Sequence, residues 1–210
     1  DAETANQKTL EEMTDYYTMW AHQIKTPIFA LRLLLQENPT VNKEALTELF
    51  KIEQYVEMVL GYLRTEDMSS DLKLSRCALD SIIREQIHKY AGIFISKKLS
   101  LTYEGISENV LTDEKWLGFV IGQILSNALK YTRTGGIRIS LKDVPDNSQN
   151  TEDISNMISL SPVTLIIEDT GIGIRKEDLP RIFEKGYTGV NGRENNRATG
   201  IGLYLSKKIM

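Results

Sequence analysis

Two groups of residues in this chain have the types and spacing for a joint chemistry. The first is a histidine in a helical pattern, within Ala21-His22-Gln23-Ile24-Lys25-Thr26-Pro27. The second is three later segments rich in glycine and polar side chains: Gln123 to Tyr131, Asp169 to Gly173, and Thr199 to Gly202. Imidazole is a nucleophile at neutral pH, and backbone amides beside glycine suit a phosphate. Together the two groups predict transfer of a phosphoryl group to histidine.

His22 by itself has an ordinary interpretation, because a single helical histidine is most often a surface or partly packed side chain. Pro27 favours the functional interpretation, since proline inside a helix costs about 3 kcal/mol and needs a reason. A local bend that exposes the imidazole is such a reason. His22 also follows the apolar Ala21, so the turn of about 100° per residue moves it away from the buried stripe. We therefore expect the ring to reach solvent.

The elements around His22 predict a helical hairpin. Apolar residues recur at steps of four and three in two stretches, the spacing of helices that pack along a seam. They are Tyr17, Ala21, Ile24, Ile28, Leu31 and Leu35, followed by Leu49, Ile52, Val56, Val59 and Leu63. Pro39 breaks the helix between them, and Thr40 or Asn42 can cap the second one. A lone hairpin leaves apolar faces uncovered, so we expect a homodimer that forms a four-helix bundle.

A second domain follows a short polar stretch. We expect the hairpin over residues 1–66, a hinge-like linker over 67–74 and an α+β sandwich over 75–210. The predicted elements are helices from Cys77 to about Phe94, from a capping Asp113 through Tyr131 and from Leu203 to Ile209, with strands Leu99 to Tyr103, Ile137 to Leu141 and Val163 to Glu168. The polar run from Asp146 to Asp153 is expected to be an exposed loop.

The helix that ends at Tyr131 has a polar side. Gln123, Asn127 and Lys130 are spaced to point the same way, and an asparagine oxygen beside a lysine suits magnesium and phosphate. A simple solvated face is the alternative interpretation. Asp169, which ends an apolar strand before Gly171 and Gly173, has two interpretations as well: a plain turn, or backbone that must approach a ligand closely.

The third segment opens a helix, where backbone amides attract anionic oxygen. It is Thr199-Gly200-Ile201-Gly202-Leu203. A glycine-rich, charged stretch precedes it and has the composition of a mobile lid. In that stretch Lys185, Arg193 and Arg197 either reach phosphate or are solvated charges. Gly-x-x-x-x-Gly-Lys followed by Ser or Thr is absent, so the pattern is not that of a P-loop.

Taken in order, these motifs resemble those of sensor histidine kinases over nearly the entire chain. The resemblance makes His22 the phospho-acceptor, with Lys25 and Thr26 at the positions that follow it. In that family the threonine helps to align the water that dephosphorylates the response regulator. Gln23 replaces the usual acidic residue, and an amide cannot act as a general base.

The same resemblance implies a Bergerat-type site for ATP and Mg²⁺. Asn127 would hold Mg²⁺, Lys130 would touch phosphate, Tyr131 would lie against the nucleoside, and Asp169 would accept a hydrogen bond from the adenine amino group. Gln123 stands where another asparagine is frequent and is a second candidate metal ligand. The remaining implied nucleotide-binding residues are Gly171, Gly173, Phe183 in an aromatic box, Thr199, Gly200, Ile201, Gly202 and Leu203.

The resemblance also implies partners and location. The histidine motif and the run Phe183-Glu184-Lys185-Gly186-Tyr187 are similar to those of intramembrane-sensing kinases that respond to cell-envelope stress and peptide antibiotics. Such a kinase would act on the receiver domain of a response regulator, beside an ABC transporter, from the bacterial cell membrane. This chain would be its cytoplasmic part, because no apolar stretch approaches the roughly 18 to 20 residues that span a bilayer.

Composition excludes some other classes. A net charge of −4 over 210 residues gives no electrostatic footprint for nucleic acid, and the lone Cys77 fits a reducing compartment. Two further functions stay open: an ATPase or serine kinase with the same nucleotide fold, and a docking module without autokinase activity. The chain ends at Met210 within a helical pattern, where an open sheet edge would remain, so we expect a piece of a longer protein.

Overall fold

A computed structural model describes residues 24–25, 28–29, 31–36, 42–65, 72–142, 163–189 and 199–210. The predictions for His22, Gln23, Thr26, Pro27, Pro39, Thr40, Arg193 and Arg197 lie outside these ranges, as do those for the loop from Asp146 to Asp153 and for most of the linker. The chain divides into two compact units, Asp1–Leu72 and Lys73–Met210, which are described separately.

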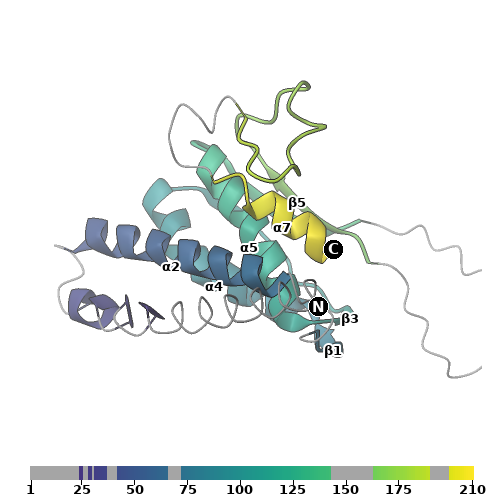
Figure 1. Cartoon of the computed structure of the whole chain (residues 1–210), viewed down its shortest axis with the longest axis horizontal. Helices are drawn as coiled ribbons and strands as arrows, with labels where there is room; N and C mark the ends of the chain where they lie inside the picture. The colour runs from purple at the N-terminus through teal and green to yellow at the C-terminus, as the bar shows by residue number, and fades with distance from the viewer. Residues whose placement is uncertain are drawn as a thin grey trace, which may run out of the picture. The chain divides into compact units, whose positions relative to one another are not determined.

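In the first unit, helical segments over 24–25, 28–29 and 31–36 pack along helix α2 (Lys43–Arg64) (Figure 1). The apolar side chains between them are Ile28, Leu49, Val56 and Leu60, with Ile24 and Leu35 packed against this cluster. The Arg32 guanidinium pairs with the Glu53 carboxylate, and the Asn42 amide donates to the Leu35 carbonyl at 3.0 Å. Residues late in one segment thus contact residues early in the other near the connection, so the two run antiparallel.

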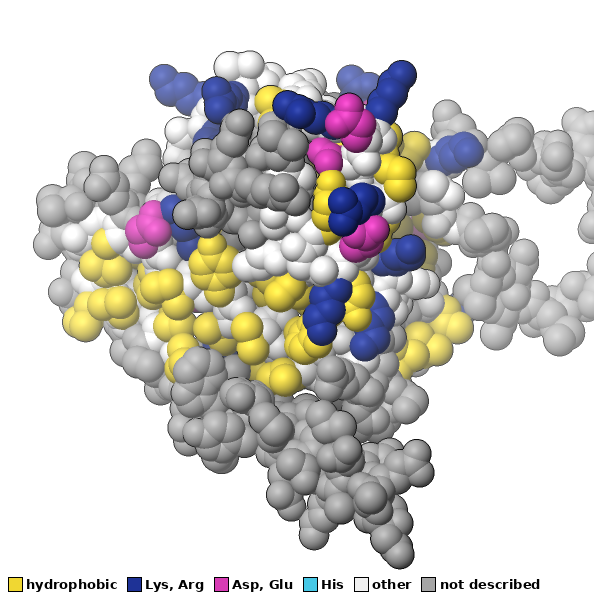
Figure 2. All heavy atoms as spheres, turned by 45° about the horizontal axis from the view of Figure 1, so that its top comes forward, with side chains coloured by type: hydrophobic (Ala, Val, Ile, Leu, Met, Phe, Trp, Pro, Cys, Tyr) yellow, Lys and Arg dark blue, Asp and Glu magenta, His cyan; other side chains and the backbone are white. Residues whose placement is uncertain are grey.

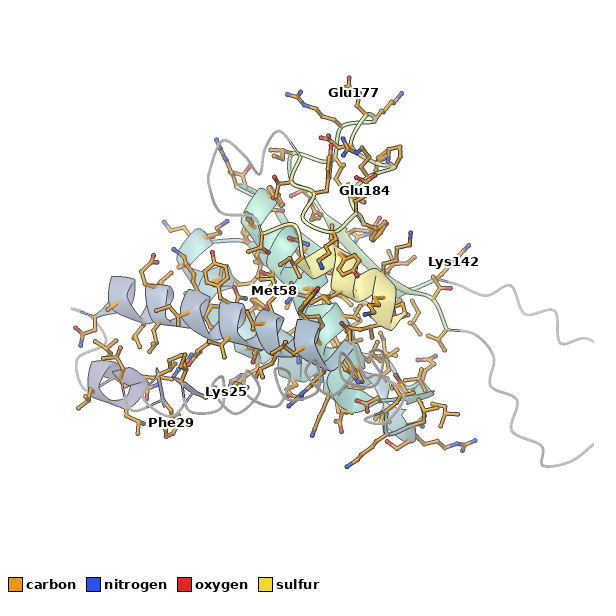
Figure 3. The ribbon with its side chains drawn as sticks, in the orientation of Figure 1. Lys25, Phe29, Met58, Lys142, Glu177 and Glu184 are labelled. Atoms are coloured by element: carbon orange, nitrogen blue, oxygen red, sulfur yellow. The ribbon has the colours of Figure 1, made fainter. Side chains whose placement is uncertain are left out.

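The predicted seam of this unit is only partly buried within the single chain. Leu49 and Val56 are buried, whereas Ile52 and Val59 are 47% and 44% exposed. Phe29 is also exposed and points away from α2 (Figure 3). The chain therefore leaves apolar side chains of both helical segments uncovered. A second copy could cover them, so the dimeric four-helix bundle stays a prediction to be tested.

Asn42 departs from its expected role. It occupies the N-cap position of α2 but makes no side-chain capping bond there. Its amide is directed back to the Leu35 carbonyl instead, where it joins the end of one helical segment to the start of the other.

The second unit confirms an α+β fold with a mixed sheet. Its elements are β1 (Ser75–Ala78), α4 (Leu79–Lys97), β2 (Ser100–Thr102), β3 (Asn109–Thr112), α5 (Glu114–Tyr131), β4 (Gly136–Leu141), β5 (Leu165–Asp169) and α7 (Gly202–Ile209). The larger sheet has the order β2-β4-β5, with β2 parallel and β5 antiparallel to β4. Asp169 lies opposite Ile137 at the end of this ladder.

Strands β1 and β3 were not predicted. The helix expected from Cys77 begins two residues later, because Ser75–Ala78 pairs antiparallel with Asn109–Thr112 and sets Cys77 opposite Val110. Both strands have only four residues, and in neither do apolar and polar residues alternate in the way that marks a strand in sequence.

Helix α5 is the central element of the second unit. It packs against α4, α7 and β5, and buries Trp116, Val120, Ile121, Leu125 and Leu129. Its start is fixed by the predicted cap, since Asp113 Oδ1 accepts from the amides of Lys115 and Trp116 at 2.9 and 3.0 Å. Asp113 Oδ2 accepts from the Lys73 amide at 2.9 Å, which attaches the beginning of the unit to the same point.

On the face shown in Figure 2, lysine, arginine and acidic side chains lie mainly in the upper and right-hand parts, whereas apolar side chains gather across the lower left. Within the described ranges, no helix combines the length and the hydropathy needed to cross a bilayer.

Replacing the α5 cap tests its contribution to stability. Asp113→Ala removes three hydrogen bonds to backbone amides, so we expect it to lower the free energy of unfolding by about 1 to 2 kcal/mol. Urea denaturation measures this loss. Glu114→Ala, at the exposed neighbouring position, is the control, and an equal loss in both variants would contradict the capping role.

The carboxylate of Asp80 predicts a pH dependence. Asp80 accepts from Arg84 Nε at 2.6 Å and from the Tyr103 hydroxyl at 2.6 Å, and these bonds hold its pKa below the ordinary value. Because the pKa of Asp80 is lower in the folded than in the unfolded state, its carboxylate stabilises the fold at pH values above the unfolded pKa of about 3.9. This stabilisation is lost as the pH falls from there through the folded-state pKa. We expect the stability difference between the native protein and Asp80→Asn to be largest near neutral pH and to shrink below about pH 5. Urea titrations at several pH values measure the difference, with the exposed Glu85→Gln as control; a difference that does not change with pH would contradict the argument.

Candidate functional site

Helix α5 supplies the predicted polar side chains. Gln123, Asn127, Lys130 and Tyr131 are all half-buried, as side chains at the border of a helix and a binding surface would be. Lys130 Nζ lies 5.0 Å from the centroid of the Tyr131 ring. Burial raises the pKa of the Tyr131 phenol, so this side chain stays neutral at physiological pH and keeps its proton.

The turn after β5 lies directly against the C-terminal end of α5. Ile172 donates its amide to the Tyr131 carbonyl at 3.3 Å, and Asp169 Oδ1 accepts from the Gly171 amide at 2.8 Å. A Cβ at Gly171 would lie 2.6 Å from Asp169 Oδ1, 2.8 Å from the Tyr131 carbonyl oxygen and 3.0 Å from Thr132 Oγ1. The sequence predicted a close approach of this backbone to a ligand, and that stays a prediction; what the structure shows at position 171 is a close approach to the end of α5.

Gly173 is required for a different reason. Nothing lies within 4 Å of the position of its Cβ, but its φ of +66° is a backbone conformation that other residues rarely adopt. The two glycines of this turn thus provide space at one position and conformation at the other.

Thr170 holds the same turn from its other side. Its hydroxyl accepts from the Gly136 amide at 3.0 Å and donates to the Thr134 carbonyl at 3.0 Å. This ties the turn after β5 to the connection between α5 and β4. Sequence reasoning missed Thr170, although its position between Asp169 and Gly171 was a signal.

The third predicted segment is fixed at both ends. The Gly186 amide donates to the Gly200 carbonyl at 3.0 Å, and Gly200 has a φ of +68° with no room for a Cβ, which would lie 2.4 Å from the Gly186 carbonyl carbon. The Thr199 hydroxyl accepts from the Ile201 amide at 3.4 Å. Helix α7 then begins at Gly202. Its N-cap residue Ile201 makes no side-chain capping bond within the described part of the chain, and amides in such a first turn are suited to anionic oxygen.

Gln123 makes the connection between α5 and α7. A Cβ at Gly202 would lie 2.4 Å from Gln123 Oε1, so the amide oxygen lies against the first residue of α7. Leu203, the next residue, is half-buried in that first turn. The structure thereby gives Gln123 a contact that the sequence had left open.

Phe183 lies in the turn-rich segment between β5 and α7. It is 40% exposed, and Lys207 Nζ from α7 lies 5.7 Å from the centroid of its ring. Nearby, the Tyr187 hydroxyl donates to Asp178 Oδ1 at 2.5 Å and the Arg181 guanidinium stacks 4.3 Å from the Tyr187 ring. Glu177 and Glu184 both project from this segment (Figure 3), and Lys185 in it is exposed.

The structure thus brings together the end of α5, the turn after β5 and the start of α7, with α5 in contact with both others. Lys25 belongs to the first unit, where it is an exposed helical side chain. Of the proposed metal ligands, Asn127 and Gln123 offer amide oxygens; within the described residues there is no group of three His, Cys, Asp or Glu side chains that could hold a metal ion.

Comparison with known proteins agrees with this geometry. Residues 112–210 match the family of histidine kinase-, DNA gyrase B- and HSP90-like ATPases. The sensor protein BceS of Halalkalibacterium halodurans is 33% identical over 206 residues, which are 97% of this chain and 57% of that protein. The sensor histidine kinase YxdK of Bacillus subtilis is 31% identical over 202 residues, or 95% of this chain and 58% of that protein.

The chain is similar to sensor histidine kinases over nearly its whole length. It spans somewhat more than half the length of these two curated relatives. The crystal structure of full-length ShkA in complex with AMPPNP shares the fold of this chain, with a TM-score of 0.57 at 17% identity over 93% of this chain and 40% of that one.

The crowding at Gly171 leads to a stability prediction. Gly171→Ala would place a methyl group 2.8 Å from a backbone carbonyl that cannot move independently of α5, so we expect unfolding to become easier by about 1 to 3 kcal/mol. Gly92→Ala, in α4 with nothing within 4 Å, should keep or raise stability and serves as the control. Urea denaturation compares the two variants; if Gly171→Ala is as stable as Gly92→Ala, the turn does not depend on the missing side chain.

Proposed function

We propose that this chain binds ATP in its second unit, transfers the γ-phosphoryl group to His22, and passes it from there to an aspartate on the receiver domain of a response regulator. The observation that carries the proposal is the convergence of a carboxylate at the end of β5, polar side chains on α5 and the uncapped first turn of α7. These three groups could bind the adenine base, a magnesium ion and the phosphates of one ATP molecule.

Each end of the nucleotide has a proposed partner. Asp169, held by the Gly171 amide, accepts from the adenine amino group, and the neutral Tyr131 ring lies against the nucleoside. Lys130 and the amides of Gly202 and Leu203 receive the phosphates, where positive charge and helix-terminal donors favour anions. The AMPPNP named with the ShkA structure is an ATP analogue, which supports this assignment by likeness of fold.

Magnesium fits the donor set. Asn127 would hold it through an amide oxygen, with Gln123 as the second candidate, and the phosphates would supply further oxygens. When bound, Mg²⁺ neutralises charge on the transferring phosphates.

The transfer itself needs one nucleophile from the first unit. An imidazole nitrogen of His22 forms a bond to the γ-phosphorus while the bond from that phosphorus to the bridging oxygen of ADP breaks. Gln23 can orient the ring through hydrogen bonds but cannot take its proton. Lys25 adds a positive charge three residues after His22 along the chain, and Thr26 is proposed to align water when the regulator is dephosphorylated.

The first unit supports a homodimer. Ile52, Tyr55 and Val59 on α2 are exposed within one chain, and a second copy would cover them in a four-helix bundle. We further propose that this is the cytoplasmic part of a membrane-anchored sensor of cell-envelope stress that acts beside an ABC transporter.

Autophosphorylation tests the proposal. With γ-labelled ATP and Mg²⁺, the native chain should gain an acid-labile, base-stable label, and His22→Gln should lose it. Asp169→Asn should weaken ATP binding by about ten- to a hundredfold, because the amide replaces a charged acceptor, whereas Glu168→Gln at the exposed neighbouring position should bind as the native chain does. Label that persists in His22→Gln refutes the acceptor assignment, and ATP binding without any label favours a docking module.

A further inference from the structure

Thr132 has a buried hydroxyl group without a hydrogen-bond partner among the described residues. It is the residue directly after α5, fully buried, and its Oγ1 has no hydrogen-bond partner in the described part of the chain. Buried hydroxyls are nearly always paired, because an unpaired one loses its bonds to water without replacement. The proposed nucleotide binding and phosphoryl transfer do not involve the Thr132 hydroxyl.

The backbone of Thr132 is held firmly. Its amide donates to the Ala128 carbonyl at 3.0 Å, and Lys97 from α4 donates to the carbonyls of both Leu129 and Thr132. The hydroxyl position is therefore set by two helices. The turn after β5 approaches the same hydroxyl through Gly171, whose Cβ would lie 3.0 Å from Thr132 Oγ1.

Two acceptors lie near that hydroxyl. Asp169 Oδ1, the Tyr131 carbonyl oxygen and Thr132 Oγ1 all lie within 3.0 Å of one point, the place where a Cβ of Gly171 would be. The Tyr131 carbonyl already accepts from the Ile172 amide, and a carboxylate is the stronger acceptor because the bond is charge-assisted. Since Gly171 has no side chain, no Cβ occupies the point that these three atoms surround.

We propose that Thr132 is a positioning residue for base recognition: its buried hydroxyl donates to the Asp169 carboxylate when a nucleotide is bound, and so holds that carboxylate toward the adenine amino group. A donor on one carboxylate oxygen fixes the direction of the other, which leaves it to accept from the base. This inference rests on the proposed role of Asp169 in binding ATP.

Thr132 should therefore affect recognition of the adenine base and not the affinity for nucleoside triphosphates as such. A purine riboside triphosphate lacks the 6-amino group that Asp169 is proposed to accept, but keeps the ring, sugar and phosphates. A group that acts only through Asp169 should therefore matter for ATP and not for this analogue. A group that merely supports the fold should affect both equally.

The experiment measures the affinity of the full chain for both nucleotides by calorimetry, in the native form and in Thr132→Val and Thr132→Ser. Valine has nearly the shape of threonine without the hydroxyl, and serine keeps the hydroxyl. We expect Thr132→Val to bind ATP about tenfold more weakly and to bind the analogue within twofold of the native chain, with Thr132→Ser close to native for both. In the Asp169→Asn background, Thr132→Val should cause no further loss.

Each result decides one question. If the native chain binds ATP and Asp169→Asn weakens it, but Thr132→Val binds both nucleotides as the native chain does, the inference about Thr132 is overturned while the proposed site stands. An equal loss for ATP and the analogue also overturns it. If Asp169→Asn leaves ATP binding unchanged, the proposed function of Asp169 fails first. Should Thr132→Val not fold, the Ser variant and Thr132→Ala provide the same comparison.

Discussion

The contact between the end of α5 and the turn after β5 is the constraint on which the rest of the second unit depends. Tyr131 offers its carbonyl to Ile172, Asp169 binds the Gly171 amide, and the missing side chain of Gly171 lets these atoms meet. Any larger residue at 171 would separate the helix from the strand end. Since Asn127, Lys130 and Tyr131 lie on that helix and Asp169 on that turn, the contact sets the distance between the two sides of the candidate site.

The neighbouring interactions make this contact rigid. Asp113 fixes the start of α5, Lys97 binds carbonyls at its end, and the Thr170 hydroxyl joins the turn to the backbone that leads into β4. At the far side, Gln123 lies against Gly202, so α7 is placed by the same helix. A site built on one well-anchored helix can be specific for its ligand, because its groups do not have to be ordered when the ligand binds.

Much of this was predictable because it depends on local patterns. The helix from Asp113 to Tyr131 has a capping aspartate at one end and an apolar stripe along its length, and both features are properties of neighbouring residues. The strand that ends at Asp169 and the helix after Gly202 were predictable for the same reason. Strands β1 and β3 were not, since each has only four residues without an alternating apolar pattern and exists only because the other one, more than 30 residues away, pairs with it. Leu60 was missed in the first unit because its burial depends on the packing of the two helical segments.

The sequence alone determined the residue types of the site, the order of its motifs and the elements that carry them, since these follow from side-chain chemistry and from spacing along the chain. Only the tertiary structure decided which atoms meet: that Gly171 gives room to α5 while Gly173 adopts a positive φ, that Gln123 contacts Gly202, and that the buried hydroxyl of Thr132 and Asp169 Oδ1 both approach the position that a Cβ of Gly171 would take. The physical reason is that such contacts join segments tens of residues apart. Their geometry comes from how helices and strands pack, which no local pattern contains.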